Sequence, residues 1–134
     1  MPTHTLEPVK DAQPDISGVA GVMVSTSSER FSTMKTFYLR LLGDALRSRR
    51  PGFVSFEWGP MRLTITQHDL VDGRALEPAR LMVNLLVDDA VAAERFARGL
   101  GAPVVRSTSP EPWGGLICTI EDPDGNYLQF MELP

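Results

Sequence analysis

Short segments of alternating or branched apolar residues along this chain predict β-strands that are separated by turns. Pro, Gly or Asp-rich turn sequences bound most of these segments, as expected for the ends of strands. The predicted strands cover residues 17–26, 44–49 (a candidate extra strand), 52–58, 61–67, 80–87, 103–108, 115–121 and 127–133.

Two other segments repeat apolar residues at spacings of three and four, which predicts amphipathic helices. The first runs from Phe31 to Leu42, and Gly43 is a natural stop after it. The TSSE sequence before it is interpreted as a capping box in which Thr26 and Glu29 satisfy each other's free backbone amides. The second helix is predicted to start at Asp88 or Asp89, to end at Gly101, and to carry Ala93, Phe96, Ala97 and Leu100 on one face.

The two halves of the chain repeat the same order of elements. Residues 1–15 contain three prolines and no periodicity, so they are predicted to be a loose N-terminal arm. A single domain is predicted at 16–134, with module one at 16–67, a polar linker at 68–79 and module two at 80–134. The repeat predicts an α+β fold of two tandem βαβββ modules, which form a curved mixed sheet around a cleft.

Composition excludes several classes of function. The chain has 134 residues and a net charge of -4, and its arginines are scattered, which argues against a nucleic-acid partner. The apolar runs are far shorter than the roughly 20 residues of a membrane span. Cys118 is the single cysteine, so it forms no internal disulfide; it lies in an apolar run, which favours a buried thiol and a reducing, cytoplasmic location.

Three stretches together resemble the vicinal oxygen chelate superfamily, which includes glyoxalase I, extradiol dioxygenases, fosfomycin-resistance enzymes and bleomycin-binding proteins. The resemblance covers about residues 16 to 133. It is carried by FYLRLLGD, by VDDAVAAERFARGLGA and, most specifically, by PWGGLICTIEDPDGNYLQF. Within the last stretch, Asp122 and Asp124 are expected to form the turn before the final strand.

The resemblance implies a test of metal binding, because enzymes of this superfamily hold a divalent ion with His, Gln or Glu at four inward strand positions. The matching positions in this chain are Gly21, Thr64, Met82 and Gln129. Only Gln129 resembles a ligand, and the two histidines, His4 and His68, lie outside the predicted strands. We therefore expect no metal and no other cofactor.

Strand alternation then predicts which side chains line the cleft, and Trp58 and Trp113 are added because they flank Gly-rich turns. The predicted ligand-binding residues are Met23, Trp58, Thr64, Thr66, Met82, Asn84, Leu86, Trp113, Tyr127, Gln129 and Met131, with Ser25 and Arg62 as further candidates. Methionines and aromatic rings give an adaptable apolar lining, and the polar members provide orienting hydrogen bonds. The alternatives are that the apolar members are core and that Gln129 bonds a neighbouring group of the protein.

Two main functional hypotheses follow. One is a metal-independent protein of the bleomycin-resistance type, which sequesters an antibiotic or other aromatic natural product in a cleft shared by the two subunits of a homodimer. The other is a metal-dependent lyase, isomerase or dioxygenase whose ligands are displaced by one strand register. A weaker third is a metal-independent enzyme that uses Glu57, Glu121 or Tyr127 as acid or base.

Overall fold

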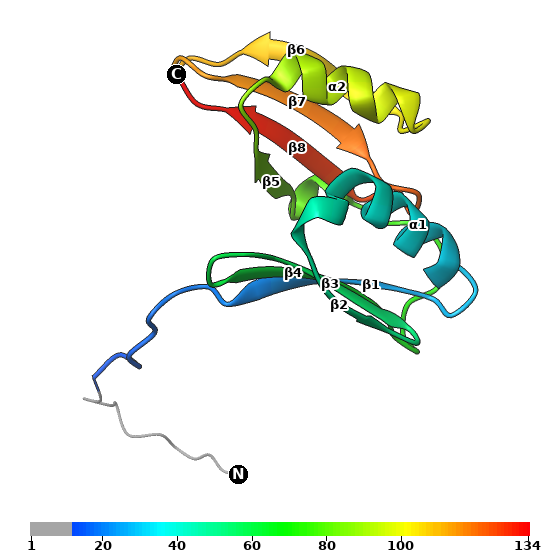
Figure 1. Cartoon of the computed structure of the whole chain (residues 1–134). Coiled ribbons are helices and arrows are strands. Elements are labelled where there is room, and N and C mark those ends of the chain that lie inside the picture. The colour runs from blue at the N-terminus through cyan, green and yellow to red at the C-terminus, as the bar shows by residue number, and fades with distance from the viewer. Residues whose placement is uncertain (1–11) are drawn as a thin grey trace.

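The computed structural model describes residues 12–134, and its regular structure consists of two βαβββ modules (Figure 1). Module one contains β1 (Gly21–Thr26), α1 (Phe31–Leu42), η1 (Gly43–Ala45), β2 (Leu46–Arg50), β3 (Phe53–Trp58) and β4 (Met61–Gln67). Module two contains β5 (Val83–Leu86), α2 (Ala90–Gly99), β6 (Val104–Pro110), β7 (Leu116–Glu121) and β8 (Tyr127–Glu132). A short helix, η2 (Pro78–Arg80), lies in the linker.

Each module forms one four-stranded mixed sheet, and the two sheets have the same topology. The strand order is β1-β4-β3-β2 in module one and β5-β8-β7-β6 in module two. The first strand of each module pairs in parallel with the last, and the other neighbours are antiparallel. The predicted α+β class and the two tandem modules are confirmed, and the candidate extra strand is present as β2.

Both sheets turn their helix-bearing faces toward the interior of the molecule. Figure 1 shows α1 between the two sheets and α2 against the sheet of module two. One hydrophobic core therefore joins both modules. Its buried members are Phe31, Met34, Phe37, Tyr38, Val54, Phe56, Leu63, Ile65, Ala97, Ala102, Cys118, Ile120, Leu128 and Phe130. The opposite faces of the two sheets carry no helix, and Met23, Ser25 and Tyr127, from both modules, line one pocket beside the linker.

The start of the chain differs in detail from the sequence prediction. Regular structure begins at Gly21, five residues after Ile16, and residues 12–20 form no helix or strand and are exposed. Most of the predicted arm, residues 1–11, lies outside the described residues. Within residues 12–134, no helix is long and apolar enough to cross a membrane.

The capping box predicted at the start of the first helix is wrong. The helix begins at Phe31, and its N-cap residue, Arg30, makes no side-chain capping bond. The Thr26 hydroxyl instead donates to Asp124 at 2.6 Å, in the turn of the other module. Because the helix starts five residues after Thr26, the local hydroxyl that accepts a backbone hydrogen bond, from the Arg30 amide at 3.2 Å, is that of Ser27. At the second helix the prediction is confirmed, because Asp89 accepts from the Ala92 amide at 3.0 Å.

A buried carboxylate fastens α2 to β6. Glu94 accepts hydrogen bonds from the backbone amide and hydroxyl of Thr108, both at 2.7 Å, and from the Ser107 hydroxyl at 2.8 Å. Arg98 forms an ion pair with the same carboxylate at 2.8 Å. Hydrogen bonds from the Thr108 amide, the two hydroxyls and Arg98 lower the pKa of Glu94 to about 2, although burial acts in the opposite direction.

Because the folded-state pKa of Glu94 is depressed, its contribution to stability is present above pH 4.5 and is lost as the pH falls toward about 2. We expect Glu94→Gln to lower the free energy of unfolding at neutral pH by about 1 to 3 kcal/mol. The variant should also lose less stability than the wild type between those two pH values. Denaturant unfolding at a series of pH values measures both effects.

The matched control is Glu77→Gln, because Glu77 is an exposed residue whose ion pair with Arg80 joins neighbours in one turn. Its unfolding curve should follow that of the wild type at every pH. If Glu94→Gln and the wild type instead lose stability in parallel on acidification, Glu94 is not the group that titrates.

Candidate ligand-binding site

The helix-free face of module two presents a polar row beside an apolar one. Strand register places Asn84, Gln129 and Thr119 side by side across β5, β8 and β7. The Gln129 amide donates to the Thr119 hydroxyl at 3.0 Å, which fixes its orientation. The neighbouring row on the same face lies two residues away along each strand. It consists of Leu86, Met131 and Ile117. The alternation that predicted Asn84, Leu86, Gln129 and Met131 on one face is therefore present in the structure.

The helix-free face of module one has a similar pattern of hydroxyls with one methionine. Met23 pairs with Thr64, and Thr64 with Ser55, across β1, β4 and β3. The Ser55 and Thr64 hydroxyls are 3.3 Å apart. Thr66 lies two residues beyond Thr64, next to Ser25, and its hydroxyl donates to the Gly52 carbonyl at 3.2 Å. Met23, Thr64 and Thr66 thus share one face, but it belongs to a different sheet from Gln129.

Three residues of these faces were missed by the sequence analysis. Ser55, Ile117 and Thr119 are direct cross-strand partners of predicted residues. The signal that identifies them is the same period-2 alternation, applied to the middle strands β3 and β7 as well as to the first and last strands. The omission arose because the resemblance directs attention to the four strands that carry metal ligands in related enzymes.

Three other predicted residues lie at the margins of these faces, and a fourth, Trp58, lies elsewhere. Tyr127 begins β8 opposite Glu121, and Met82 precedes β5 and is 38% exposed. Trp113 lies in the turn before β7, where its ring covers Gly115 so closely that a Cβ there would overlap it. Trp58 is a correction, because its pairing with Met61 gives it the same orientation as Phe56, on the helix-bearing side. It therefore does not flank the face that carries Thr64.

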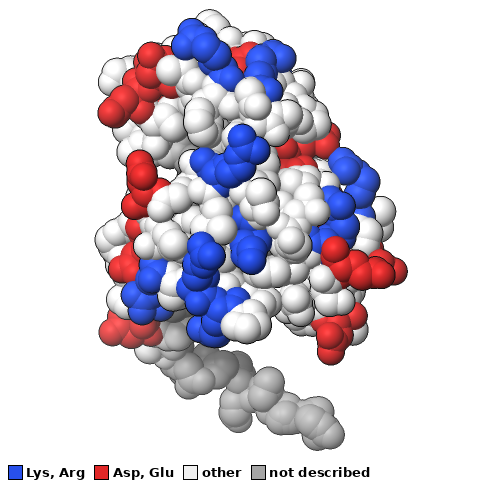
Figure 2. Space-filling view, turned by 45° about the vertical axis from the view of Figure 1, so that its right-hand side comes forward, with Lys and Arg blue, Asp and Glu red and all other residues white. Residues whose placement is uncertain are grey.

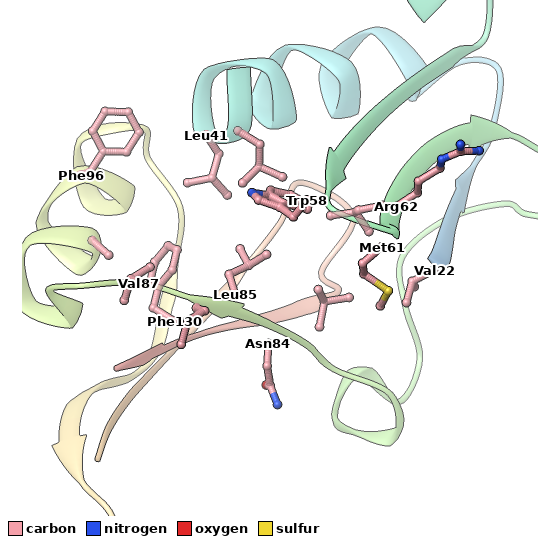
Figure 3. Close-up of a pocket in the computed structure, with 15 residues that line it drawn as sticks. Val22, Leu41, Trp58, Met61, Arg62, Asn84, Leu85, Val87, Phe96 and Phe130 are labelled. Carbon is pink, nitrogen blue, oxygen red and sulfur yellow. The ribbon is translucent and has the colours of Figure 1, made fainter. Parts of the chain in front are cut away.

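Trp58 instead contributes to a groove between the two modules (Figure 3). This inter-module groove has a volume of about 540 Å³. Figure 3 shows the labelled Trp58, Leu41, Leu85 and Phe130 around one space, while the amide of Asn84 points away from it. The lining is Val22, Leu41, Leu42, Trp58, Met61, Arg62, Leu63, Val83, Asn84, Leu85, Leu86, Val87, Ala93, Phe96 and Phe130.

The residues at the four metal positions do not fit a divalent ion. Gly21 has no room for a ligand side chain, since a Cβ there would lie 2.4 Å from the Arg62 carbonyl oxygen. Thr64 and Met82 offer a hydroxyl and a thioether, and the Gln129 amide already bonds Thr119. Within residues 12–134 no group of three or more His, Cys, Asp or Glu side chains could hold a metal ion. This donor set lacks the carboxylates and imidazoles that such ions require.

The reactive groups of the chain are used in its structure. Cys118 is fully buried, and burial raises the pKa of its thiol to about 11, so the nucleophilic thiolate does not form at neutral pH. Glu57 is paired with Arg47, and Glu121 with Arg74, both at 2.8 Å. Figure 2 shows both kinds of charge on one face of the molecule, with wide uncharged areas between them.

Comparison with protein families shows which family the chain belongs to. A family model, the Glyoxalase-like domain, matches residues 22–131. The chain belongs to the glyoxalase-like domain family. The match spans both modules and the linker, and it supports membership of the vicinal oxygen chelate superfamily. No curated protein matches the chain.

Solved structures with the same fold are distant in sequence from this glyoxalase-like domain. A glyoxalase-related enzyme from Fulvimarina pelagi is 18% identical, with 89% of this chain and 90% of that one covered and a TM-score of 0.69. A glyoxalase/bleomycin resistance protein/dioxygenase family enzyme from Burkholderia phytofirmans PsJN is 16% identical, with 86% and 98% covered and a TM-score of 0.67. Lactoylglutathione lyase from Agrobacterium tumefaciens is 18% identical, with 88% and 95% covered and a TM-score of 0.66. At these identities the likeness establishes the fold alone.

The metal content of the purified protein tests whether this glyoxalase-like domain binds a divalent ion. We expect protein purified without chelators, and freed of any histidine tag, to contain zinc, nickel, manganese and iron well below one ion per chain. Elemental analysis by mass spectrometry measures this. A stoichiometric ion that only a chelator removes would show that the ligand set has been misassigned.

Proposed function

We propose that this glyoxalase-like domain binds a mid-sized, partly aromatic organic molecule without a metal ion and carries out no reaction on it. The observation that carries the proposal is the row of Asn84, Gln129 and Thr119 beside the apolar row of Leu86, Met131 and Ile117. Amides and hydroxyls orient a ligand by hydrogen bonds, and the apolar row supplies contact area. A neutral amide does so without placing an unpaired charge against an apolar wall.

Sequestration of an antibiotic or other natural product is the role that best suits such a site. The absence of a suitable metal donor set, within residues 12–134, argues against the lyase or dioxygenase chemistry named for some of the similar structures. The ion pairs of Glu57 and Glu121 argue against their use as a free acid or base. The similar Burkholderia structure is that of a glyoxalase/bleomycin resistance protein/dioxygenase family enzyme, which makes bleomycin a suitable first probe.

We further propose that the binding cleft forms between two copies of the chain, in the cytoplasm. A single helix-free sheet face is open on one side, whereas ligand pockets bury most of their ligand. The strands β1 and β5 are edge strands of their sheets. Exposed apolar side chains lie on and beside them, with Met23 66%, Leu81 78% and Leu86 70% exposed. Pairing the module-one face of one copy with the module-two face of another would cover these edges and close two equivalent clefts.

Assembly is the first test of this proposal. At micromolar concentration we expect a symmetric homodimer, twice the 14.8 kDa of the chain, because exposed apolar edges favour association. Sedimentation equilibrium measures the mass. The substitution Leu86→Lys, which places a charge on the exposed edge, should shift the equilibrium toward the monomer, and Leu70→Lys in the linker is the matched control. A wild-type protein that stays monomeric would rule out the shared cleft.

Ligand binding is the second test. Metal-free bleomycin and anilinonaphthalene sulfonate are titrated into the protein by calorimetry in the presence of a chelator, and we expect saturable binding of at least one. Gln129→Ala removes an orienting hydrogen bond of about 0.5 to 1.5 kcal/mol, so the affinity should fall several-fold and up to about tenfold. Truncation of an exposed glutamine outside the two faces, Gln67→Ala, is the matched control and should leave the affinity unchanged.

Melting temperatures of both variants must first match the wild type, so that a loss of folding is not read as a loss of binding. The proposed function is contradicted if neither compound binds, or if the two glutamine variants bind equally well.

A further inference from the structure

An arginine stands among the neutral polar residues of the helix-free face of module one. Strand register makes Arg62, in β4, the direct partner of Gly21 in β1 and of Glu57 in β3. Thr64 lies two residues further along β4, so it shares a face of the sheet with Arg62. Figure 3 agrees with this assignment, because the guanidinium of the labelled Arg62 is directed away from the inter-module groove. Arg62 is exposed, so a ligand on this face can reach it.

Glycine at position 21 permits the close pairing that places Arg62. A Cβ at this position would lie 2.4 Å from the Arg62 carbonyl oxygen and 3.2 Å from the Arg62 Cβ, so a larger residue would push the two strands apart. The glycine also leaves no side chain beside Arg62 on the β1 side. Gly21 and Thr64, the two module-one positions that match metal ligands in related enzymes, are therefore the neighbours of a fixed cation.

The carboxylate opposite Arg62 is already engaged by another arginine. Glu57 accepts a hydrogen bond from Arg47 at 2.8 Å. On the helix-free face of module two, Glu121 is paired with Arg74 at the same distance. Arg62 forms no ion pair within residues 12–134. The binding faces thus keep a positive charge without a partner, although the whole chain has a net charge of -4.

A second arginine lies at the other end of the same face. Arg50 pairs with Phe53, which in turn pairs with Thr66, so Arg50 is two rows away from Arg62. Its guanidinium lies 3.7 Å from the centroid of the Phe53 ring. In the described part of the chain Arg50 also has no ion-pair partner. Cations at both ends, with hydroxyls between them, favour a ligand that carries negative charge.

We propose that the ligand of this site is an organic anion whose carboxylate, sulfonate or phosphonate group pairs with Arg62. This inference rests on the proposed function, because it names the class of ligand that the same site takes. A guanidinium presents parallel N–H groups that match two oxygens of such an acidic group. The pair is stronger in a closed cleft than in open water, because the effective dielectric constant is lower there. The apolar row of Leu86 and Met131 then contacts the aromatic part of the same molecule.

Two fluorescent probes that differ in their acidic group test this inference on the full chain. Anilinonaphthalene sulfonate is compared with phenylnaphthylamine, which has the same rings and no sulfonate. In Arg62→Gln we expect the affinity for the sulfonate to fall about tenfold, while the affinity for the neutral amine stays unchanged. Arg62→Lys keeps the charge and should retain most of the sulfonate affinity. Added salt should weaken sulfonate binding to the wild type more than to Arg62→Gln.

The matched control is Arg95→Gln. Arg95 is an exposed arginine of α2 that forms no ion pair within residues 12–134, and it lies outside both helix-free faces. Both probes should bind this variant as they bind the wild type. Unchanged binding of the neutral amine also shows that Arg62→Gln is folded.

The inference is overturned if Arg62→Gln binds the sulfonate as tightly as the wild type does, or if it loses affinity for both probes equally. Failure of this inference is distinct from failure of the proposed function. If bleomycin binds and the sulfonate does not, or if Gln129→Ala weakens sulfonate binding while Arg62→Gln does not, the proposed function stands and the acidic group is wrong. If no probe binds, both are wrong.

Discussion

A buried pair of aspartates in one turn holds the two modules together. The turn between β7 and β8 contains Asp122, 2% exposed, and Asp124, 4% exposed. Asp124 accepts from the Thr26 hydroxyl at 2.6 Å and from Arg30 at 3.0 Å, and both donors belong to module one. Asp122 accepts from the hydroxyl of Tyr38, in α1, at 2.7 Å. The turn of one module is thus bonded to the strand and helix of the other.

Burying these carboxylates costs free energy unless they are hydrogen-bonded, so the arrangement favours one placement of the modules. A carboxylate that leaves water must find donors for its oxygens, and burial raises the pKa of Asp122 despite its hydrogen bonds. Besides Tyr38, it accepts from the backbone amides of Asp124 and Asn126 and from the Asn126 side chain. Other placements of the modules would leave Asp124 without Thr26 and Arg30, and Asp122 without Tyr38. The helix-bearing faces are consequently held against each other, and the helix-free faces remain outside.

Because the helix-free faces belong to separate sheets, a cleft that uses Thr64 and Gln129 together would have to form between two copies of the chain. Thr64 and Gln129 lie on separate sheets with α1 and the shared core between them. The residues that the superfamily resemblance groups together are therefore brought together only if the faces of two copies meet. In the proposed function, ligand binding therefore depends on dimer formation, because the same faces serve both.

Strand positions and the faces of side chains could be predicted from local pattern, because each depends on residues near in sequence. Gln129 and Met131 alternate with Leu128 and Phe130, and this alone separates the outer face from the core. The orientation of the modules could not be predicted in this way, because the pattern marks Phe37 as apolar without naming its partner. Thr26 shows the same limit: the local pattern predicts a capping box with Glu29, whereas its hydroxyl donates to Asp124, 98 residues away.

Trp58 was misplaced for a different reason. It was assigned to the cleft because it precedes a Gly-Pro turn, whereas its face depends on its pairing with Met61 in the hairpin. Counting from Phe56 in steps of two places it on the helix-bearing side, so the error lay in using proximity to a turn in place of alternation. The same count applied to β7 would have added Ile117 and Thr119 to the outer face.

The positions that hold metal in related enzymes are not the positions that hold this fold together. Within this chain the two modules depend on Asp122, Asp124 and the core, while Gly21, Met82 and Gln129 lie outside that core. Glu94 and Cys118, which in another setting could do chemistry, tie a helix down and fill the interior. A substitution at Met82 or Gln129 therefore changes the chemistry of the outer face without removing a core residue, whereas a side chain at Gly21 would meet the Arg62 carbonyl. The architecture depends on one set of residues and the chemistry of the faces on another, so the same fold can carry different functions.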